Sequence, residues 1–226
     1  MLSGRMVEAY SDFEAWLHDF FVAERALNLH RYIFQETKLS DVFAEKKERR
    51  VLDVGCGGGQ AAIWLKGLYP HLEMTGIDLS EPQIERARVR ARQKGCAVQF
   101  EVANAQALPF PDGHFDIVYS LGSVKHWPNP LQGVSECWRV LKPGGELLLM
   151  DSTSDATHEQ IVSFYRIAGF PKLLERPVVA AITRIIFRAS RPMAVYRDVA
   201  DQLKMPPGTV GFAPELPSFL FRTRKP

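Results

Sequence analysis

The sequence has few cysteines, and none of them is paired. Its 226 residues include only Cys56, Cys96 and Cys137, and no two of these form a Cys-x-x-Cys pair. Structural zinc sites and disulfide frameworks need clustered or paired cysteines. We therefore expect no metal site and no disulfide, and we predict a reducing, cytoplasmic location.

Long apolar runs and a strong net charge are missing too. No stretch reaches the roughly 20 apolar residues that span a bilayer, and no basic start is followed by an apolar run as in a secretory leader. We therefore expect neither a transmembrane segment nor a leader. The net charge of +2 gives no field typical of nucleic-acid binding, so we expect no nucleic-acid partner.

What the sequence does have is a regular alternation of strand-like and helix-like segments. Strands are expected at residues 51–54, 74–78, 98–103, 115–120 and 146–151, and helices at 60–68, 81–94 and 131–141. Such alternation predicts an α/β fold with a doubly wound, mostly parallel sheet. Residues 209–212 and 219–224 are expected to form an antiparallel hairpin at its end. Ser80 and Gln83 have the spacing of a capping box for the second helix.

The turn after the first expected strand is the most informative segment. Asp53, Gly55, Gly57 and Gly59 give the pattern D-x-G-x-G-x-G. Glycines let a ligand approach the backbone, and the helix that follows offers free N–H groups. This arrangement suits a nucleotide-like cofactor at the edge of a parallel sheet. Asp53 is expected to face a positive part of that ligand, and a second acid, Asp78, ends the next strand.

The dinucleotide fingerprint G-x-G-x-x-G is the alternative interpretation. Counted from Gly55, it needs a glycine where the chain has Gln60. Counted from Gly57, it meets Ala62, a variant that the fingerprint sometimes allows. Asp78 fits either cofactor, because an acid at that strand end can accept both ribose hydroxyls. A nicotinamide-dependent oxidoreductase therefore stays open as an alternative.

Three further segments follow the glycine turn in a fixed order. After VLDVGCGGG come ANAQALPF at 103–110, FDIVYS at 115–120 and RVLKPGG at 139–145. Over residues 50–151 the chain resembles the class I S-adenosylmethionine-dependent methyltransferases, in the broad subgroup that includes the quinone-biosynthesis C-methyltransferases. This resemblance implies a Rossmann-like, seven-stranded sheet and S-adenosylmethionine as cofactor, which becomes S-adenosylhomocysteine.

The resemblance assigns roles to residues of the glycine turn. In the family, the glycines that match Gly55 and Gly57 let the methionine part of the cofactor pass close to the backbone, and Gly59 completes the motif. The acid that matches Asp53 helps to hold the cofactor's ammonium group.

Other roles follow at the next strand ends. Asp78 is expected to bind the ribose, with Leu79 beside it. Asn104 stands where the family commonly has an aspartate, and its amide oxygen can accept the same hydrogen bond from the adenine amino group. The backbone N–H of Ala105 is expected to face the adenine ring, and backbone groups of Ser120 and its neighbour Leu121 the methionine moiety.

His126 is the candidate catalytic base. It stands just past the fourth strand, where the cofactor's methyl group should point, and an ordinary histidine pKa suits proton transfer. The family often has two histidines here, and this chain has Lys125 in the first position. The alternative is that the ring packs or hydrogen-bonds to fix the loop. Weaker pocket candidates are Tyr10, His30, Tyr32 and Tyr165.

The flanking segments are expected to cover the substrate within a single domain. Its parts are a helical cap (1–45), the cofactor-binding core (46–151), a helical insert or lid (152–208) and the terminal hairpin (209–226). In the cap, an apolar stripe predicts an amphipathic helix: Phe13, Trp16, Leu17, Phe20 and Phe21. Arg184, Arg188 and Arg191 are spaced to share one helix face, which suits a membrane surface, an acidic substrate, or a solvated lid or dimer helix.

We thus predict methyl transfer from S-adenosylmethionine to an O, N or C nucleophile of a small, hydrophobic or aromatic molecule. A non-catalytic cofactor-binding regulator is the second alternative. Peripheral membrane contact and a homodimer both stay open.

Overall fold

The computed structural model describes residues 24–45, 47–186, 190–213 and 215–226. The helix expected around residues 13–21 lies outside these ranges, as do Tyr10 and Arg188. The described helices are α2 (Glu24–Glu36), α3 (Leu39–Ala44), α4 (Gln60–Leu68), α5 (Glu81–Gln93), α6 (Pro130–Val140), α7 (His158–Ile167), α8 (Glu175–Ile186) and α9 (Met193–Gln202), with short 3-10 turns η2 (Val124–His126) and η3 (Lys172–Leu174).

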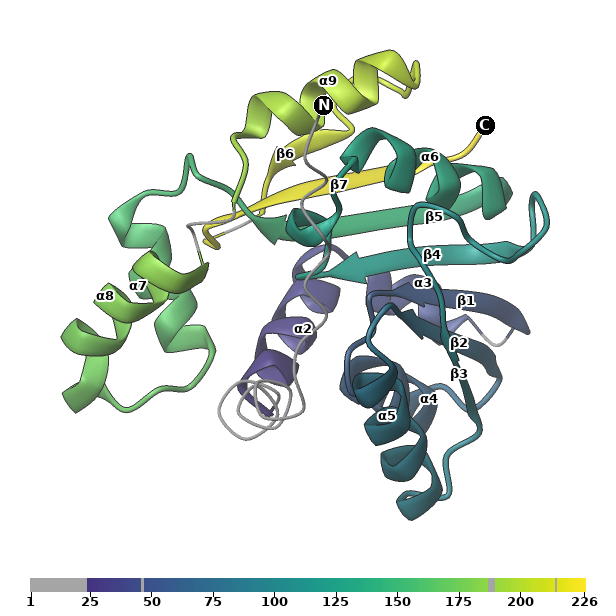
Figure 1. Cartoon of the computed structure of the whole chain (residues 1–226), viewed down its shortest axis with the longest axis horizontal. Coiled ribbons are helices and arrows are strands. Elements are labelled where there is room, and N and C mark those ends of the chain that lie inside the picture. The colour runs from purple at the N-terminus through teal and green to yellow at the C-terminus, as the bar shows by residue number, and fades with distance from the viewer. Residues whose placement is uncertain (1–23, 46, 187–189, 214) are drawn as a thin grey trace, which may run out of the picture.

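One seven-stranded sheet forms the centre, in the order β3-β2-β1-β4-β5-β7-β6. All its pairings are parallel except those of β7, which runs antiparallel to β5 and β6. The predicted doubly wound sheet with a terminal antiparallel hairpin is therefore confirmed (Figure 1). The strands are β1 (Arg49–Val54), β2 (Leu72–Asp78), β3 (Val98–Val102), β4 (Phe115–Leu121), β5 (Leu141–Ser152), β6 (Val210–Phe212) and β7 (Ser218–Arg224).

Helices cover both faces of the sheet, which is why the central strands read as continuous apolar runs. Side chains of α6 and α9 pack on one face, including Val134 and Tyr196. Side chains of α2, α3, α4 and α5 pack on the other. Phe34 of α2 is 1% exposed and belongs to this second core. Phe34 therefore serves packing of the core.

The fifth strand begins earlier than predicted, at residue 141 rather than 146. Leu141 already pairs with Phe115, and the register shifts between Phe115 and Ile117. This irregularity absorbs the glycine-containing segment that the sequence presents as a turn.

The predicted capping box at α5 is also wrong. Ser80 does occupy the N-cap position, but its side chain accepts no capping hydrogen bond. In a capping box, Gln83 would bond to the backbone N–H of Ser80. Here that N–H donates instead to Asp78 Oδ1 at 2.9 Å, and Pro82 removes one N–H donor from the first turn.

The first part of the insert, with α7 and α8, forms a helical unit at one end of the sheet, whereas α9 packs on the sheet face. Figure 1 shows α7 and α8 beyond the carboxyl ends of β4 and β5, with α2 beside them. Ile161, Tyr165 and Val179 form a small core of their own. The guanidinium of Arg25 lies 4.7 Å above the ring centre of Phe170, so the two flanks of the chain touch each other.

Candidate cofactor and acceptor site

The glycine turn is built by backbone geometry. Gly55, Gly57 and Gly59 have φ angles of 76°, 51° and 76°, a left-handed region that glycine adopts without steric cost. The N–H groups of Gly55 and Cys56 both donate to the carbonyl of Ile77, at 2.8 and 2.9 Å. The turn is thereby tied to the end of β2, beside the acid that ends that strand.

The three glycines differ in what surrounds them. A Cβ on Gly59 would lie 2.6 Å from Phe100 and 2.9 Å from Ala87, and one on Gly55 would lie 2.0 Å from the Ser123 hydroxyl. A Cβ on Gly57 would meet no heavy atom within 4 Å in the described part of the chain. Gly59 therefore serves close packing, whereas Gly57 faces open space.

Asp78 is held by backbone donors. Its Oδ2 accepts from the N–H of Gly57 and its Oδ1 from the N–H of Ser80, both at 2.9 Å. A carboxylate has about four acceptor sites, so capacity remains for hydroxyl donors such as those of a ribose. Leu79, the next residue, is 41% exposed.

Asp53 lies on β1 beside the turn and is 3% exposed. The hydroxyl of Tyr119 on β4 donates to its Oδ2 at 3.0 Å. Burial raises the pKa of Asp53 to about 7, the Tyr119 hydrogen bond counteracts this in part, and the charge of Asp78 adds to the rise. The carboxyl group thus titrates near neutral pH.

The segment after β3 carries the predicted adenine contacts. Asn104 is exposed and half-buried Ala105 follows it. The side-chain oxygen of Asn104 accepts from the N–H of Gln106 at 2.9 Å, which closes a local turn. An amide oxygen has two lone pairs, so a second donor can still be accepted.

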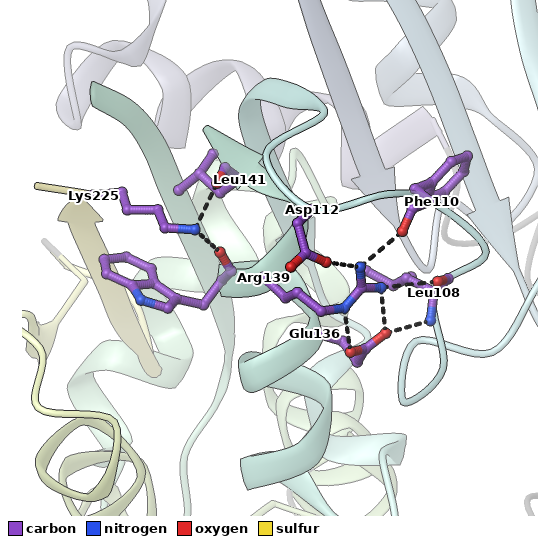
Figure 2. Close-up of polar contacts among 8 residues, drawn as sticks. Leu108, Phe110, Asp112, Glu136, Arg139, Leu141 and Lys225 are labelled. Atoms are coloured by element: carbon purple, nitrogen blue, oxygen red, sulfur yellow. Dashed lines mark hydrogen bonds and ion pairs between the residues drawn. The ribbon is translucent and has the colours of Figure 1, made fainter. Parts of the chain in front are cut away.

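Arg139 of α6 anchors this segment (Figure 2). Its guanidinium donates to the carbonyls of Leu108 and Phe110 at 3.0 and 2.8 Å, and to Asp112 at 2.7 Å. It also binds both carboxylate oxygens of Glu136, at 2.7 and 2.8 Å, and Glu136 accepts the N–H of Leu108 at 2.8 Å. The planar guanidinium group of Arg139 thereby fixes the path of the chain past the end of β3.

The loop after β4 holds the remaining predicted residues. Ser120 is fully buried, Leu121 is half-buried and His126 is exposed at the end of η2. The backbone N–H of His126 donates to the carbonyl of Ser123 at 3.0 Å, so η2 fixes where the imidazole emerges. The catalytic role of His126 stays a prediction.

A buried ion pair supports this loop from behind. Lys125 Nζ lies 3.1 Å from Asp151 Oδ1, and the two side chains are 14% and 1% exposed. The N–H of Lys125 also donates to Asp151 Oδ2 at 2.8 Å. Where the family often has a first histidine, this chain therefore has a lysine that joins η2 to the end of β5.

Arg191 holds the same loop, and this corrects its predicted place. Helix α8 ends at Ile186, so Arg191 does not share a helix face with Arg184. It pairs instead with Thr153 in an isolated parallel bridge. Its guanidinium donates to the carbonyls of Lys125 and Trp127, at 3.4 and 3.0 Å.

The weaker candidates are spread over the flanks. His30 and Tyr32 are half-buried on α2, and burial lowers the pKa of His30 to about 4. Tyr165 is 0% exposed and donates its hydroxyl to the carbonyl of Pro171, inside the insert. Its role is therefore packing.

The sequence did not point to four residues that shape the site. These are Tyr119, Arg139, Asp151 and, through its contacts with the loop after β4, Arg191. Tyr119 and Arg139 lie in quoted motifs, and the spacing of Glu136 and Arg139 predicts an i, i+3 ion pair. The other contacts join residues that are distant in sequence.

The sheet order, the glycine turn and the acids at two adjacent strand ends define a class of protein, the S-adenosylmethionine-dependent methyltransferases. Residues 52–149 match the family described as "Methyltransferase domain". The predicted family is thus confirmed, and the cofactor of this family is S-adenosylmethionine, not a nicotinamide.

Two curated relatives and one solved structure illustrate the likeness. 27-O-demethylrifamycin SV methyltransferase of Amycolatopsis mediterranei is 35% identical over 66% of this chain and 57% of its own length. Demethylmenaquinone methyltransferase of Deinococcus radiodurans is 41% identical over 46% of this chain and 43% of its own. The chain therefore spans only about half the length of these relatives.

The solved structure is that of a methyltransferase from Aquifex aeolicus. It matches with a TM-score of 0.66 at 17% identity, over 95% of this chain and 98% of that one. At this identity the likeness concerns the fold alone.

Two further kinds of feature are absent from the described residues. No three histidine, cysteine or acidic side chains gather there as a metal site would require. Over the same residues, no helix combines the length and the apolarity needed to cross a bilayer.

Proposed function

We propose that this chain transfers the methyl group of S-adenosylmethionine to an O, N or C nucleophile of a small, hydrophobic or aromatic molecule. The observation that carries the proposal is the cluster at the ends of β1 and β2. There, an open glycine with a φ of 51° lies beside two carboxylates. Its two carboxylate acceptors match a ligand that carries an ammonium group and ribose hydroxyls as donors.

Each part of the cofactor has a partner in this arrangement. Asp78 would accept hydrogen bonds from the ribose hydroxyls, and Asp53 would face the ammonium. The open side of Gly57 would let the methionine part pass close to the backbone. Asn104 and Ala105 would frame the adenine, on a segment whose path Arg139 sets.

The bound cofactor supplies an activated methyl group, so the protein mainly has to position the acceptor and exclude water. The loop after β4 is suited to positioning, because the Lys125–Asp151 pair and Arg191 hold it from two sides. His126 would take a proton from the acceptor where the nucleophile needs it.

The flanks that the structure describes would close the acceptor side. In doubly wound sheets, ligands bind outside the carboxyl ends of the strands. Helices α7 and α8 lie beyond those ends with α2 beside them (Figure 1). The relatives' names are consistent with an apolar acceptor, since one names a rifamycin oxygen and the other a menaquinone precursor.

The test is formation of S-adenosylhomocysteine with acceptor panels: phenols and quinols, macrocyclic alcohols, and sugars as the contrasting class. Turnover with a phenol, quinol or macrocycle and none with sugars is the expected result. If the chain binds the cofactor tightly and methylates no member of any panel, the regulator alternative gains instead.

A truncation tests whether the N-terminal flank covers the acceptor side. Removing residues 1–28 should abolish transfer and leave a folded protein that still binds the cofactor, because the cofactor contacts lie on the strand ends. Calorimetry and turnover on the same preparation separate the two properties. Full activity in the truncated protein would contradict the proposed covering of the acceptor side by this flank.

A further inference from the structure

The hydrogen bond between Tyr119 and Asp53 joins two central strands at the cofactor end of the sheet. The two residues are direct partners in the parallel register of β4 and β1. Tyr119 is 0% exposed and Asp53 is 3% exposed. Within the part of the chain that the structure describes, the tyrosine hydroxyl gives this carboxylate its one hydrogen bond, at 3.0 Å to Oδ2. An ionised carboxylate that is buried without any hydrogen-bond donor would have a large desolvation cost.

The tyrosine ring packs against an aromatic side chain of α2. Phe34 meets the Tyr119 ring edge-on, with ring centres 5.6 Å apart. Phe34 is itself stacked on Trp64 at 6.1 Å and meets Phe43 edge-on at 5.5 Å. Since these rings are packed on several sides, the hydroxyl has a defined direction. Helix α2 is thereby connected to the cofactor end through two side chains.

We propose that Tyr119 is a positioning residue for the cofactor's ammonium group: its hydroxyl holds Oδ2 of Asp53 and leaves Oδ1 to the ammonium. This inference rests on the proposed function, because it needs an ammonium-bearing cofactor in the site. It assigns to β4 a part in cofactor binding that acts through a side chain of β1.

The charges around Asp53 give the proposal a pH signature. Burial raises the pKa of Asp53, the Tyr119 hydrogen bond lowers it and the charge of Asp78 raises it, with a net value of about 7. Burial raises the pKa of Tyr119 well above its ordinary value, and the charge of Asp53 adds to this. Burial likewise raises the pKa of the Cys56 thiol, so both groups stay neutral.

Elsewhere on α2, burial lowers the pKa of His30 to about 4. The imidazole is therefore neutral over the relevant range. Asp53 has a pKa of about 7, so its carboxyl group is neutral below that pH and ionised above it. Affinity for an ammonium ligand should fall as the pH drops through about 7. Removing the hydroxyl should move this fall to higher pH.

The test compares two ligands by calorimetry between about pH 5.5 and 8.5. S-adenosylhomocysteine carries the ammonium group, and 5′-methylthioadenosine lacks it. In Tyr119→Phe, affinity for S-adenosylhomocysteine should fall about tenfold at neutral pH, with the acid limb of its profile displaced upward. Affinity for 5′-methylthioadenosine should stay as in the unchanged protein.

Two further variants keep the test sharp. Asp53→Asn should remove the acid limb, and adding Tyr119→Phe to it should have no further effect on S-adenosylhomocysteine affinity. Tyr165→Phe is the matched control, because it removes another buried tyrosine hydroxyl, one bonded to the Pro171 carbonyl in the insert. It should leave both ligands' affinities unchanged.

Equal losses for both ligands in Tyr119→Phe would assign the hydroxyl a merely structural role and overturn the inference. An unchanged affinity and pH profile for S-adenosylhomocysteine would overturn it as well. If the unchanged protein bound neither ligand at any pH, the proposed function itself would fail, and the inference with it.

Discussion

The cofactor end and the acceptor end of this site are built by different means. At the ends of β1 and β2 the geometry comes mainly from backbone: glycines with positive φ, and an acid held by two N–H groups. At the ends of β4 and β5 it comes from side chains, with Lys125 bound to Asp151 and Arg191 bound to two carbonyls.

This difference has a consequence for substrate range. A backbone cradle depends on few side chains and suits a ligand that is the same throughout a family. Side-chain networks can be exchanged residue by residue, which suits an acceptor that differs between relatives. We therefore expect changes at the cofactor end to alter affinity and changes at the acceptor end to alter turnover.

The largest effect is expected from His126→Asn. If the imidazole takes a proton from the acceptor, turnover should fall about 10²–10⁴-fold with cofactor affinity nearly intact. Steady-state turnover and calorimetry measure the two quantities. His114→Asn is the control, because this half-buried ring stacks on Phe110 at the opposite end of β4. A loss below about threefold would show that another residue is the base, or that positioning suffices.

A pair of glycine variants should give the next largest effect and divides binding from folding. Gly57→Val places a branched side chain in open space and should lower cofactor affinity by about two orders of magnitude, at a strain cost of about 1–2 kcal/mol. Gly59→Val meets Phe100 and Ala87, so overpacking should lower the free energy of unfolding by about 1–3 kcal/mol beyond that strain. Calorimetry and urea unfolding distinguish them, and identical behaviour would contradict the assignment.

Asp78→Ala should lower cofactor affinity at least about tenfold, since hydrogen bonds to a charged group contribute about 1.5–3 kcal/mol each. Glu73→Ala, on the same strand but paired with Arg50 in solvent, is the control and should bind as before. Unchanged S-adenosylmethionine affinity in Asp78→Ala would remove the ribose assignment.

The smallest effect is expected from Arg191→Lys. An ammonium group cannot reproduce the fork that reaches the carbonyls of Lys125 and Trp127, so the loop after β4 should loosen. Turnover should drop by a factor of about 3–10, with cofactor affinity unchanged. Arg184→Lys, at an exposed position of α8, should leave both properties alone. A loss of affinity in Arg191→Lys would show that the two ends of the site are not separable in this way.

Features that depend on local signals could be predicted from the sequence, and features that depend on contacts between separate segments could not. The turn after β1 and its acids were predictable, because glycine identity and the alternation of strands and helices are local signals. The prediction of a capping box at Ser80 was wrong although its spacing is correct. The carboxylate of Asp78 accepts the Ser80 N–H that the box would use. The prediction that the arginines share one helix face was wrong because α8 ends before Arg191. The periodicity of the sequence does not reveal where the helix ends.

By itself, the sequence determined the order of strands and helices, the place of the glycine turn and the two acids beside it. Only the tertiary structure decided that Tyr119 donates to Asp53, that Phe34 is core, and that Arg191 returns to the loop after β4. The physical reason is separation along the chain. Tyr119 and Asp53 are 66 residues apart, as are Arg191 and Lys125, and such contacts exist only once the sheet has set which strands are neighbours.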